Sequence, residues 1–391
     1  MGENMKKVLI LGGGFAGIEA AIYLRKNDFD VTLISDRDYL YVYPTSIWIP
    51  TGDSSFEENC ISLKLLQKAH GFNLIIDHVQ SIKSAENKVY CKNKTYDYEY
   101  LVVAIGSHKM KHKGIKNTLT ICGEPTESIK IKDTIDALIE KGSGKIAMGF
   151  GGNPKDQSNV RGGPTFEVLF NLHNKLKNLG IRDNFELTFF APMEKPGARM
   201  GPQALKMMDV IYKKLDIKHQ TGKKIVKFKD NGILFEDDIF IESDFTMFIA
   251  AGDGHKVFED SDLPLNEAGF IKINDYCEVD GAKNVFAIGD CVALDGPKWR
   301  AKQGHIAEVM AKNTAFNINA KESGDDERKG YSNHLNILCI MDTGDGAAFV
   351  YRSDKRGVMI PMPVVGHWMK KGWGWYYKNS KLGKIPRIPG L

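Results

Sequence analysis

Residues 6–17 read Lys6-Lys-Val-Leu-Ile-Leu-Gly-Gly-Gly-Phe-Ala-Gly17, an apolar run followed by spaced glycines. The run predicts a buried strand, and the alanine-rich segment behind it predicts a helix. In such a unit Gly12 permits the tight turn, Gly14 lets a pyrophosphate approach the backbone, and Gly17 lets helix and strand pack closely. The stretch therefore predicts a dinucleotide site at the N-terminus of that helix.

A second apolar strand, residues 31–36, follows at the spacing expected for a Rossmann unit. The end of this strand commonly carries an acidic residue that binds a ribose. Here Ser35 stands at the strand end, and the carboxylate comes one position later, at Asp36. We expect these two residues to lie beside the ribose.

Two later segments end in further motifs of the same kind. Residues 98–106 predict a strand that ends in Ala-x-Gly, and residues 284–290 predict a strand that ends in Gly-Asp. In this order the three motifs resemble those of the two-dinucleotide-binding-domain flavoproteins. The resemblance implies an α/β fold with two Rossmann-like domains and a C-terminal domain, with FAD as the cofactor. It also implies that Asp290 hydrogen-bonds the ribityl chain of the flavin.

Residues 41–44, 187–194 and 302–308 are similar to the sulfide:quinone oxidoreductase and flavocytochrome c sulfide dehydrogenase branch, with type II NADH dehydrogenases as more distant relatives. This resemblance implies that a proline lies beside the isoalloxazine. It also implies that a helix begins under the pyrimidine ring, where its dipole stabilises the anionic reduced flavin. The FAD contacts that we expect are Gly12, Gly14, Phe15, Ala16, Gly17, Ser35, Asp36, Pro44, Val79, Ala104, Gly106, Gly289, Asp290, Lys302 and Gln303.

The alternation of strand and helix patterns indicates parallel sheets. We expect residues 1–110 and 250–320 to form a discontinuous FAD-binding domain. Residues 111–249 would form a second Rossmann-like domain with a degenerate nucleotide turn. Residues 321–391 would form a C-terminal domain that contacts quinone and membrane.

The second nucleotide turn, residues 149–167, looks like a glycine fingerprint interrupted by a polar insertion. Pro154 would disturb a helix start there. The following strand ends at Pro192 and meets no carboxylate until Glu194. These features disfavour an NADH site without excluding one.

The resemblance implies three redox cysteines, and two positions match. Cys122 matches the one after the first FAD segment, and Cys339 matches the one before an Asp-x-Gly turn. The third belongs in the turn after residues 145–150, but no cysteine occurs between Cys122 and Cys277. The usual disulfide therefore cannot form, which puts sulfide chemistry in question.

Three residues are the catalytic candidates. Cys339 is either the sulfur near flavin C4a or a core residue of an apolar strand, and a catalytic thiol would require a lowered pKa. Cys122 is a second redox thiol, a flavin attachment point or a buried thiol. Glu167 is expected at the start of a helix. It is either a proton carrier with a raised pKa or an acid stabilised by the helix dipole.

Composition narrows the class and compartment. No apolar run is long enough to span a membrane, and the N-terminus lacks a signal-peptide pattern. We therefore expect no transmembrane segment and no signal peptide. Six scattered cysteines without Cys-x-x-Cys argue against structural zinc and a disulfide scaffold, and the histidines show no metal spacing. We therefore expect no metal site.

The C-terminal tail, residues 366–391, interleaves three of the five tryptophans with six cations. No Asp or Glu follows Asp354, although the chain's formal charge is only +4. Aromatic and basic residues together favour a membrane surface, so we expect a peripheral membrane protein on an unspecified side. An aromatic plug between domains is the alternative, and nothing else in the chain supports nucleic-acid binding.

The sequence thus predicts an FAD-dependent oxidoreductase that passes two electrons from a reduced sulfur species to a quinone. The alternative is a type II NADH:quinone oxidoreductase, in which Gly149, Gly151 and Gly163 would line a nicotinamide path. A non-catalytic FAD-holding scaffold is the third interpretation. The sequence leaves the quinone type, covalent attachment of FAD and a homo-oligomer open.

Overall fold

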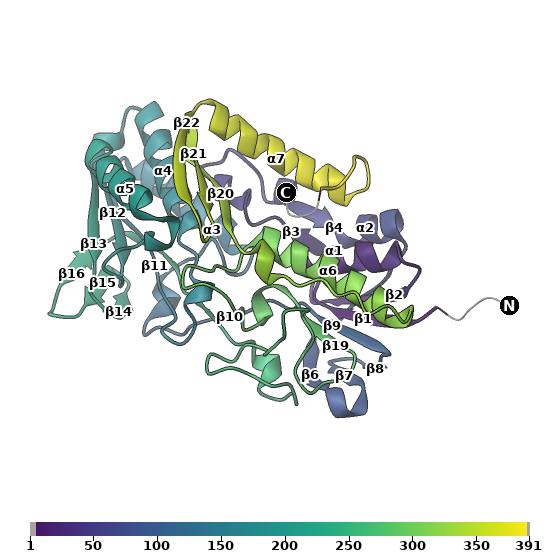
Figure 1. Ribbon diagram of the computed structural model, residues 1–391. Helices are drawn as coiled ribbons and strands as arrows, with labels where there is room; N and C mark the ends of the chain where they lie inside the picture. The colour runs from purple at the N-terminus through teal and green to yellow at the C-terminus, as the bar shows by residue number, and fades with distance from the viewer. Residues whose placement is uncertain (1–4, 389–391) are drawn as a thin grey trace.

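The computed structural model describes residues 5–388, which form two parallel-sheet units and a smaller antiparallel unit (Figure 1). The expected α/β class with two Rossmann-like units is confirmed. The first parallel sheet has the strand order β19-β9-β1-β2-β5. Its strands are β1 (Lys7–Leu11), β2 (Asp30–Ser35), β5 (Asn73–Ile76), β9 (Tyr100–Val103) and β19 (Val285–Ala287).

Two long helices cover this sheet and pack closely on each other. They are α1 (Phe15–Arg25) and α6 (Gly304–Glu322), and most of their residues are buried. Smaller elements surround the unit: β3 (Tyr39–Tyr41), β4 (Cys60–Ser62), α2 (Leu63–His70), β6 (Val79–Lys83), β7 (Lys88–Cys91) and β8 (Thr95–Asp97). Residues 284–320 thus return to the first sheet from far along the chain, as the motif order requires.

The second parallel sheet has the order β13-β12-β11-β17. Its strands and flanking helices are α3 (Glu127–Lys141), β11 (Gly144–Phe150), α4 (Gly163–Asn178), β12 (Phe185–Ala191), α5 (Pro202–Lys214), β13 (Ile217–Thr221) and β17 (Phe245–Ile249). A three-stranded sheet adjoins it: β14 (Ile225–Lys229), β15 (Gly232–Phe235) and β16 (Phe240–Glu242). Aromatic side chains, among them Phe166 and Phe189 with ring centroids 4.9 Å apart, fill this core.

The chain passes between the two parallel sheets at one short antiparallel pair. β10 (His108–Lys109) is hydrogen-bonded to β18 (Gly252–Asp253). These crossings lie within three residues of the boundaries that we expect at 110 and 250. The division into three domains remains a proposal.

The C-terminal unit has three antiparallel strands and one helix. They are β20 (Ile337–Asp342), β21 (Gly346–Arg352), β22 (Gly357–Pro363) and α7 (Val365–Lys381). The tail is therefore largely helical. α7 runs from this sheet across to α1 and α6 (Figure 1). Lys370, Tyr377 and Lys381 lie on its buried face.

Candidate functional site

The glycine turn after β1 has the geometry of a phosphate cradle. Gly12 has a φ of +106°, in the region that favours glycine. A Cβ on Gly17 would overlap the carbonyl oxygen of Gly12, so helix and turn touch through backbone alone. At Gly14, by contrast, no described atom lies within 4 Å of where a side chain would begin. The space above Gly14 and the N-terminus of α1 therefore suit a pyrophosphate.

The other N-terminal candidates surround this turn. Ser35 is buried, and its hydroxyl donates a 2.7 Å hydrogen bond to the carbonyl of Arg37, while Asp36 is exposed beside that arginine. Ala104 packs beneath the turn, where its amide donates to the carbonyl of Leu11. Pro44, Val79 and Gly106 are half-buried, in loops or at the start of a strand.

Phe15 is used differently from its neighbours in the fingerprint. Its ring stacks on Tyr377 of α7, with centroids 4.9 Å apart. A Cβ on Gly304 would also contact the Phe15 ring. Any contact of Phe15 with the cofactor therefore falls to its backbone, whereas Ala16 and Gly289 pack closely together.

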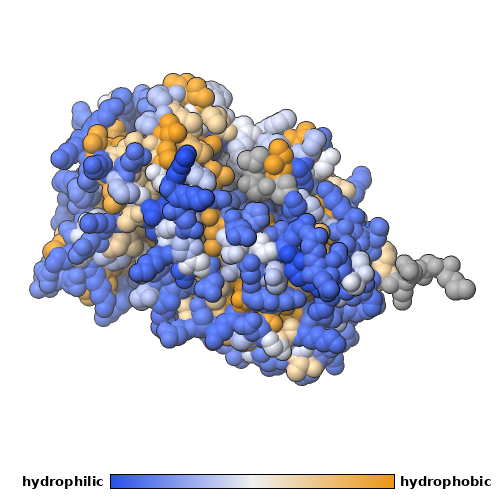
Figure 2. Space-filling model, viewed as in Figure 1, coloured by the Kyte–Doolittle hydropathy of each residue, from blue (hydrophilic) through white to orange (hydrophobic). Residues whose placement is uncertain are grey.

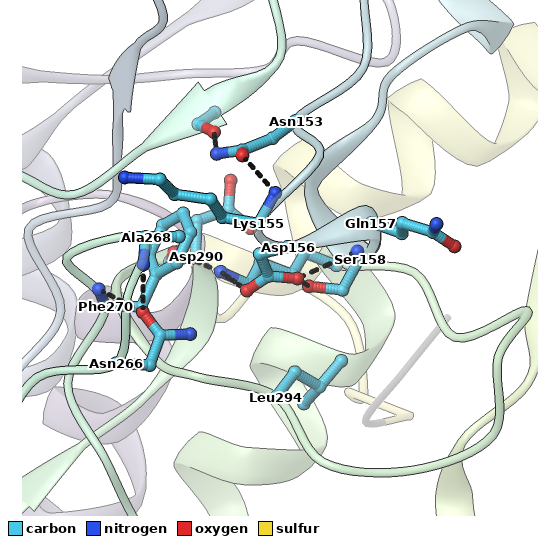
Figure 3. Close-up of polar contacts among 12 residues, drawn as sticks. Asn153, Lys155, Asp156, Gln157, Ser158, Asn266, Ala268, Phe270, Asp290 and Leu294 are labelled. Atoms are coloured by element: carbon cyan, nitrogen blue, oxygen red, sulfur yellow. Dashed lines mark hydrogen bonds and ion pairs between the residues drawn. The ribbon is translucent and has the colours of Figure 1, made fainter. Parts of the chain in front are cut away.

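Asp290 follows β19, and residues from the second parallel unit converge on it (Figure 3). The buried ammonium of Lys302 donates to the Asp290 carbonyl at 3.1 Å and lies 3.9 Å from Asp156. Burial lowers the pKa of Lys302 to about 7, against the opposing effect of Asp156. The Asp290 carboxylate pairs with Arg161.

Gln303 ties the start of α6 to the C-terminal sheet. Its amide nitrogen donates to the carbonyl of Leu338, and its amide oxygen accepts from the Leu338 N–H, both at 3.4 Å. Leu338 precedes Cys339, so this pair of bonds holds the thiol's strand against the N-terminus of α6. The strand that carries Cys339 and the positive N-terminus of α6 thus lie side by side, at the helix start where the resemblance places the flavin pyrimidine ring.

Glu167 is almost fully buried and has two partners from distant segments. It pairs with Lys370 of α7, and it accepts a 2.8 Å hydrogen bond from the amide of Asp342. Burial raises the pKa of Glu167, while Lys370 opposes the shift. Glu167 lies one turn inside α4. If it carries protons, Lys370 is the ion-pair partner of its ionised form. The Asp342 carboxylate itself binds His367 at 2.7 Å and Trp48 at 3.2 Å.

Cys339 and Cys122 both lie within electrostatic reach of Glu167, and all six cysteines are free thiols. Burial, reinforced by Glu167, raises the pKa of Cys339 to about 12. Burial also raises the pKa of Cys122, but Lys109 and Arg161 oppose the shift. Neither thiol therefore has, in this form of the protein, the lowered pKa that a resting nucleophile requires.

The interrupted turn after β11 folds into the protein. Asn153 donates to the carbonyl of Gly252 at 3.0 Å, and Asp156 accepts from the amide and hydroxyl of Ser158 (Figure 3). Asn153, Asp156, Ser158 and Asn159 are all buried. Gly149 and Gly162 are packed by Phe190 and Phe150, whereas nothing described lies near a Cβ on Gly163. The polar insertion thus folds against Gly252 and against Lys302, which itself contacts the Asp290 carbonyl.

These residues fit FAD. The open cradle at Gly14, the Asp290 carboxylate and the start of α6 line one continuous stretch along the carboxyl ends of β1 and β19. Sequence reasoning found the cradle and Asp290 because each follows a strand, and the start of α6 from the resemblance of residues 302–308. It missed Lys109, Arg161, Lys370 and the Asp342–His367 pair, which no local pattern marks.

Comparisons with known proteins agree with this geometry. The family model described as pyridine nucleotide-disulphide oxidoreductase matches residues 6–311. A sulfide-quinone reductase from Aquifex aeolicus is 26% identical over 96% of this chain and 89% of its own length. A type II NADH:quinone oxidoreductase from Staphylococcus epidermidis is 22% identical over 91% of this chain and 92% of its own length. The solved structure of the sulfide:quinone oxidoreductase from Aquifex aeolicus superposes on this chain with a TM-score of 0.88 at 23% identity. The superposition covers 97% of this chain and 92% of the solved one.

Proposed function

Because this chain belongs to the pyridine nucleotide-disulphide oxidoreductase family and is an FAD-dependent oxidoreductase, we propose that it oxidises a reduced sulfur species and reduces a membrane quinone. FAD, when bound, would carry two electrons from the sulfur donor to the quinone. The observation that carries the proposal is the meeting of Cys339, Glu167 and the start of α6. A thiol, a buried carboxylate and a positive helix end are the groups that such a transfer needs beside a flavin.

On the donor side, Cys339 is the sulfur that we assign to contact the donor. It lies on β20, held by the paired bonds between Gln303 and Leu338. Because its thiol is protonated in the buried site, a proton must leave before it can act as a nucleophile. Glu167 is the carboxylate within reach to accept that proton.

On the acceptor side, Glu167 and Lys370 form a buried pair beneath α7. Quinone reduction consumes two protons, so an acceptor site needs a buried proton donor near the flavin. A carboxyl whose pKa is raised by burial holds a proton more readily than an exposed one. Lys370 keeps this site electrically balanced when the carboxyl is ionised.

Anaerobic flavin bleaching tests the donor. We expect sulfide to bleach the flavin absorbance of the purified protein rapidly, and an added quinone to restore it. Cys339→Ala is expected to slow bleaching by roughly a hundredfold or more, as loss of a nucleophile does. Stopped-flow absorbance measures the rate, and Cys60→Ala, another half-buried thiol, is the matched control.

NADH is the second donor in the same experiment. Slow or absent bleaching by NADH is expected because the polar insertion after β11 folds into the protein where an uninterrupted glycine turn would bind the nucleotide. Fast bleaching by NADH alone would reject the sulfur donor and favour the NADH:quinone alternative, which the Staphylococcus relative represents. Bleaching by neither reagent would leave the FAD-holding scaffold.

For the membrane contact, we propose the exposed face of α7 and the adjoining strand. Hydrophobic residues gather at the top of the molecule, over β22 and the start of α7 (Figure 2). Val364, Val365, Trp368 and Trp375 are each more than 60% exposed. Within residues 5–388 no helix is long and apolar enough to cross a bilayer. Large apolar side chains on a basic helix suit binding within the membrane interface.

Two cations of the tail lie in the interior of the protein. Lys370 and Lys381 are buried in ion pairs with glutamates, so neither is available to anionic headgroups. Tyr377 is buried on the same inner face of α7. Membrane contact then falls to the opposite face.

Replacing both Trp368 and Trp375 by Ser is expected to weaken binding to anionic vesicles by at least about tenfold, because two large apolar side chains leave the interface. Co-sedimentation with phosphatidylglycerol-containing vesicles measures the partition. Val226→Ser removes an exposed apolar residue from β14, far from α7, and should change nothing. Equal loss in both variants would count against α7 as the contact.

A further inference from the structure

Asp342, at the end of β20, connects the Glu167–Lys370 pair to a histidine of α7. The amide of Asp342 donates a 2.8 Å hydrogen bond to Glu167. Its carboxylate is fully buried and lies 2.7 Å from Nδ1 of His367. The indole of Trp48 donates to the same carboxylate at 3.2 Å. Because an ionised carboxylate only accepts hydrogen bonds, Nδ1 of His367 is the donor.

The charges of this cluster do not balance unless it binds one more proton. Lys370 balances Glu167, which leaves the Asp342 carboxylate with His367 as its only ion-pair partner within residues 5–388. With both acids ionised and the imidazole neutral, the cluster carries one net negative charge. A buried net charge is costly, and one proton removes it. At the other end of α7, by contrast, two buried glutamates meet two permanent cations.

The charges around the cluster do not supply the missing one. Burial raises the pKa of the neighbouring Cys339 to about 12, so this thiol is neutral. Lys371 lies 5.3 Å from the centre of the Trp48 ring, and Asp345 is exposed in the turn after β20. These last two are near the surface and of opposite sign, so the charge inside is set by the protons of the cluster itself.

His367 is the member of the cluster that water can reach. Its side chain is 16% exposed, whereas the Asp342 side chain is 0% and that of Glu167 is 4% exposed. The ring contacts the buried Trp48 and the exposed Trp368, with centroids 5.9 and 5.7 Å away. Nε2, the other ring nitrogen, has no hydrogen-bond partner among the described residues, so it is available to take a proton from water.

We propose that His367 takes up a proton from solvent when Glu167 gives its proton to the quinone, so that the buried cluster stays neutral. Reduction of a quinone to a quinol adds two electrons and two protons. Both electrons and one proton come with an anionic reduced flavin, so the protein must supply the second proton. Glu167 supplies it to a quinone oxygen, and His367 acts on the quinone only through the charge of Glu167. The inference rests on the proposed acceptor and adds the residue that compensates the transfer.

Reoxidation of the FAD-loaded protein tests this without a sulfur donor. The flavin is photoreduced anaerobically and mixed with decylubiquinone or menadione, and stopped-flow absorbance follows its reoxidation. His367→Gln can still donate to Asp342 but cannot gain a charge. We expect it to slow reoxidation by about tenfold, less than the roughly hundredfold or more for loss of a proton donor itself. Because a histidine is charged at low pH, the wild-type rate should fall as the pH rises, and the His367→Gln rate should lack this component.

A second substitution separates charge from structure. Adding Asp342→Asn to His367→Gln removes the acid that needed compensation, so the double variant should recover most of the wild-type rate. A purely structural defect would instead grow with the second substitution. His70→Gln is the matched control, because His70 is also half-buried and contacts α7, through the carbonyl of Lys381 at 2.6 Å. Its rate should equal that of wild type.

Each outcome decides between the inference and the acceptor on which it rests. If His367→Gln loses FAD, Asp342→Asn alone decides, because this variant should keep the low-pH rate as the pH rises. A His367→Gln rate equal to wild type, or a double variant no faster than His367→Gln, would overturn the inference and leave the quinone acceptor standing. Failure of both quinones to reoxidise the wild-type flavin would overturn the acceptor and the inference together.

Discussion

Replacing Lys381 by Met is expected to lower the free energy of unfolding by about 3–5 kcal/mol, the cost of removing one partner from a buried ion pair. The Lys381 side chain is fully buried at the end of α7, between Glu19 of α1 and Glu308 of α6. Arg387 contacts the same two carboxylates. The cluster thus balances two acids with two cations, and the substitution would leave one buried carboxylate uncompensated.

Urea denaturation followed by circular dichroism measures this loss. Lys378→Met, on the same helix but half-exposed, is the control and should change the unfolding midpoint little. Adding Glu19→Gln to Lys381→Met removes the uncompensated charge and should recover part of the stability. A Lys381→Met midpoint equal to that of the control would show that the cluster contributes little.

Gly17→Ala is expected to abolish FAD binding. The new Cβ would overlap the carbonyl oxygen of Gly12, which is backbone and is fixed by the hydrogen bond from the Gly12 amide to Ile34 at 2.7 Å. The turn must therefore move, and with it the amides that face the pyrophosphate. We expect the FAD content of the purified protein to fall at least about tenfold, with a loss of stability of about 1–3 kcal/mol or more from overpacking.

The Gly14→Ala variant distinguishes a loss of FAD binding from a loss of close packing at the glycine turn. A Cβ on Gly14 meets no described atom, so this variant should melt like wild-type protein stripped of FAD. Its methyl group would nevertheless enter the pyrophosphate space and weaken FAD binding. Absorbance at 450 nm gives FAD content, and thermal melting of the apoproteins gives stability. If both variants melt alike without FAD, the close packing at Gly17 is not what sets stability.

The parts of the site that the sequence predicted lie after strands or near the start of a helix. Gly12 and Asp290 each follow an apolar run, and Glu167 follows a glycine pair that begins α4; the structure places all three as these local patterns indicate. Lys370 lies 203 residues from its partner Glu167, and Lys381 lies 362 residues from Glu19. Such pairs follow from how α7 crosses the molecule, which no local periodicity encodes.

The tail illustrates the same limit. Its interleaved aromatic and basic residues indicated a lipid-facing surface, but the 3.6-residue turn of a helix divides them into two faces. Trp368 and Trp375 are exposed, whereas Tyr377 and Lys381 are buried. The composition of the tail does not tell which of these side chains face solvent and which face the interior.

α7 is a rod of 17 residues, about 25 Å long, held by ion pairs in its second turn and at its C-terminal end. Lys370 fixes it to α4 at one end, and Lys381 fixes it to α1 and α6 at the other. A rod held at two points cannot tilt about one without straining the other. A force applied to its outer face is therefore shared between Glu167 of α4 and the helices α1 and α6. α7 thus connects the second parallel unit to the first as one stiff element.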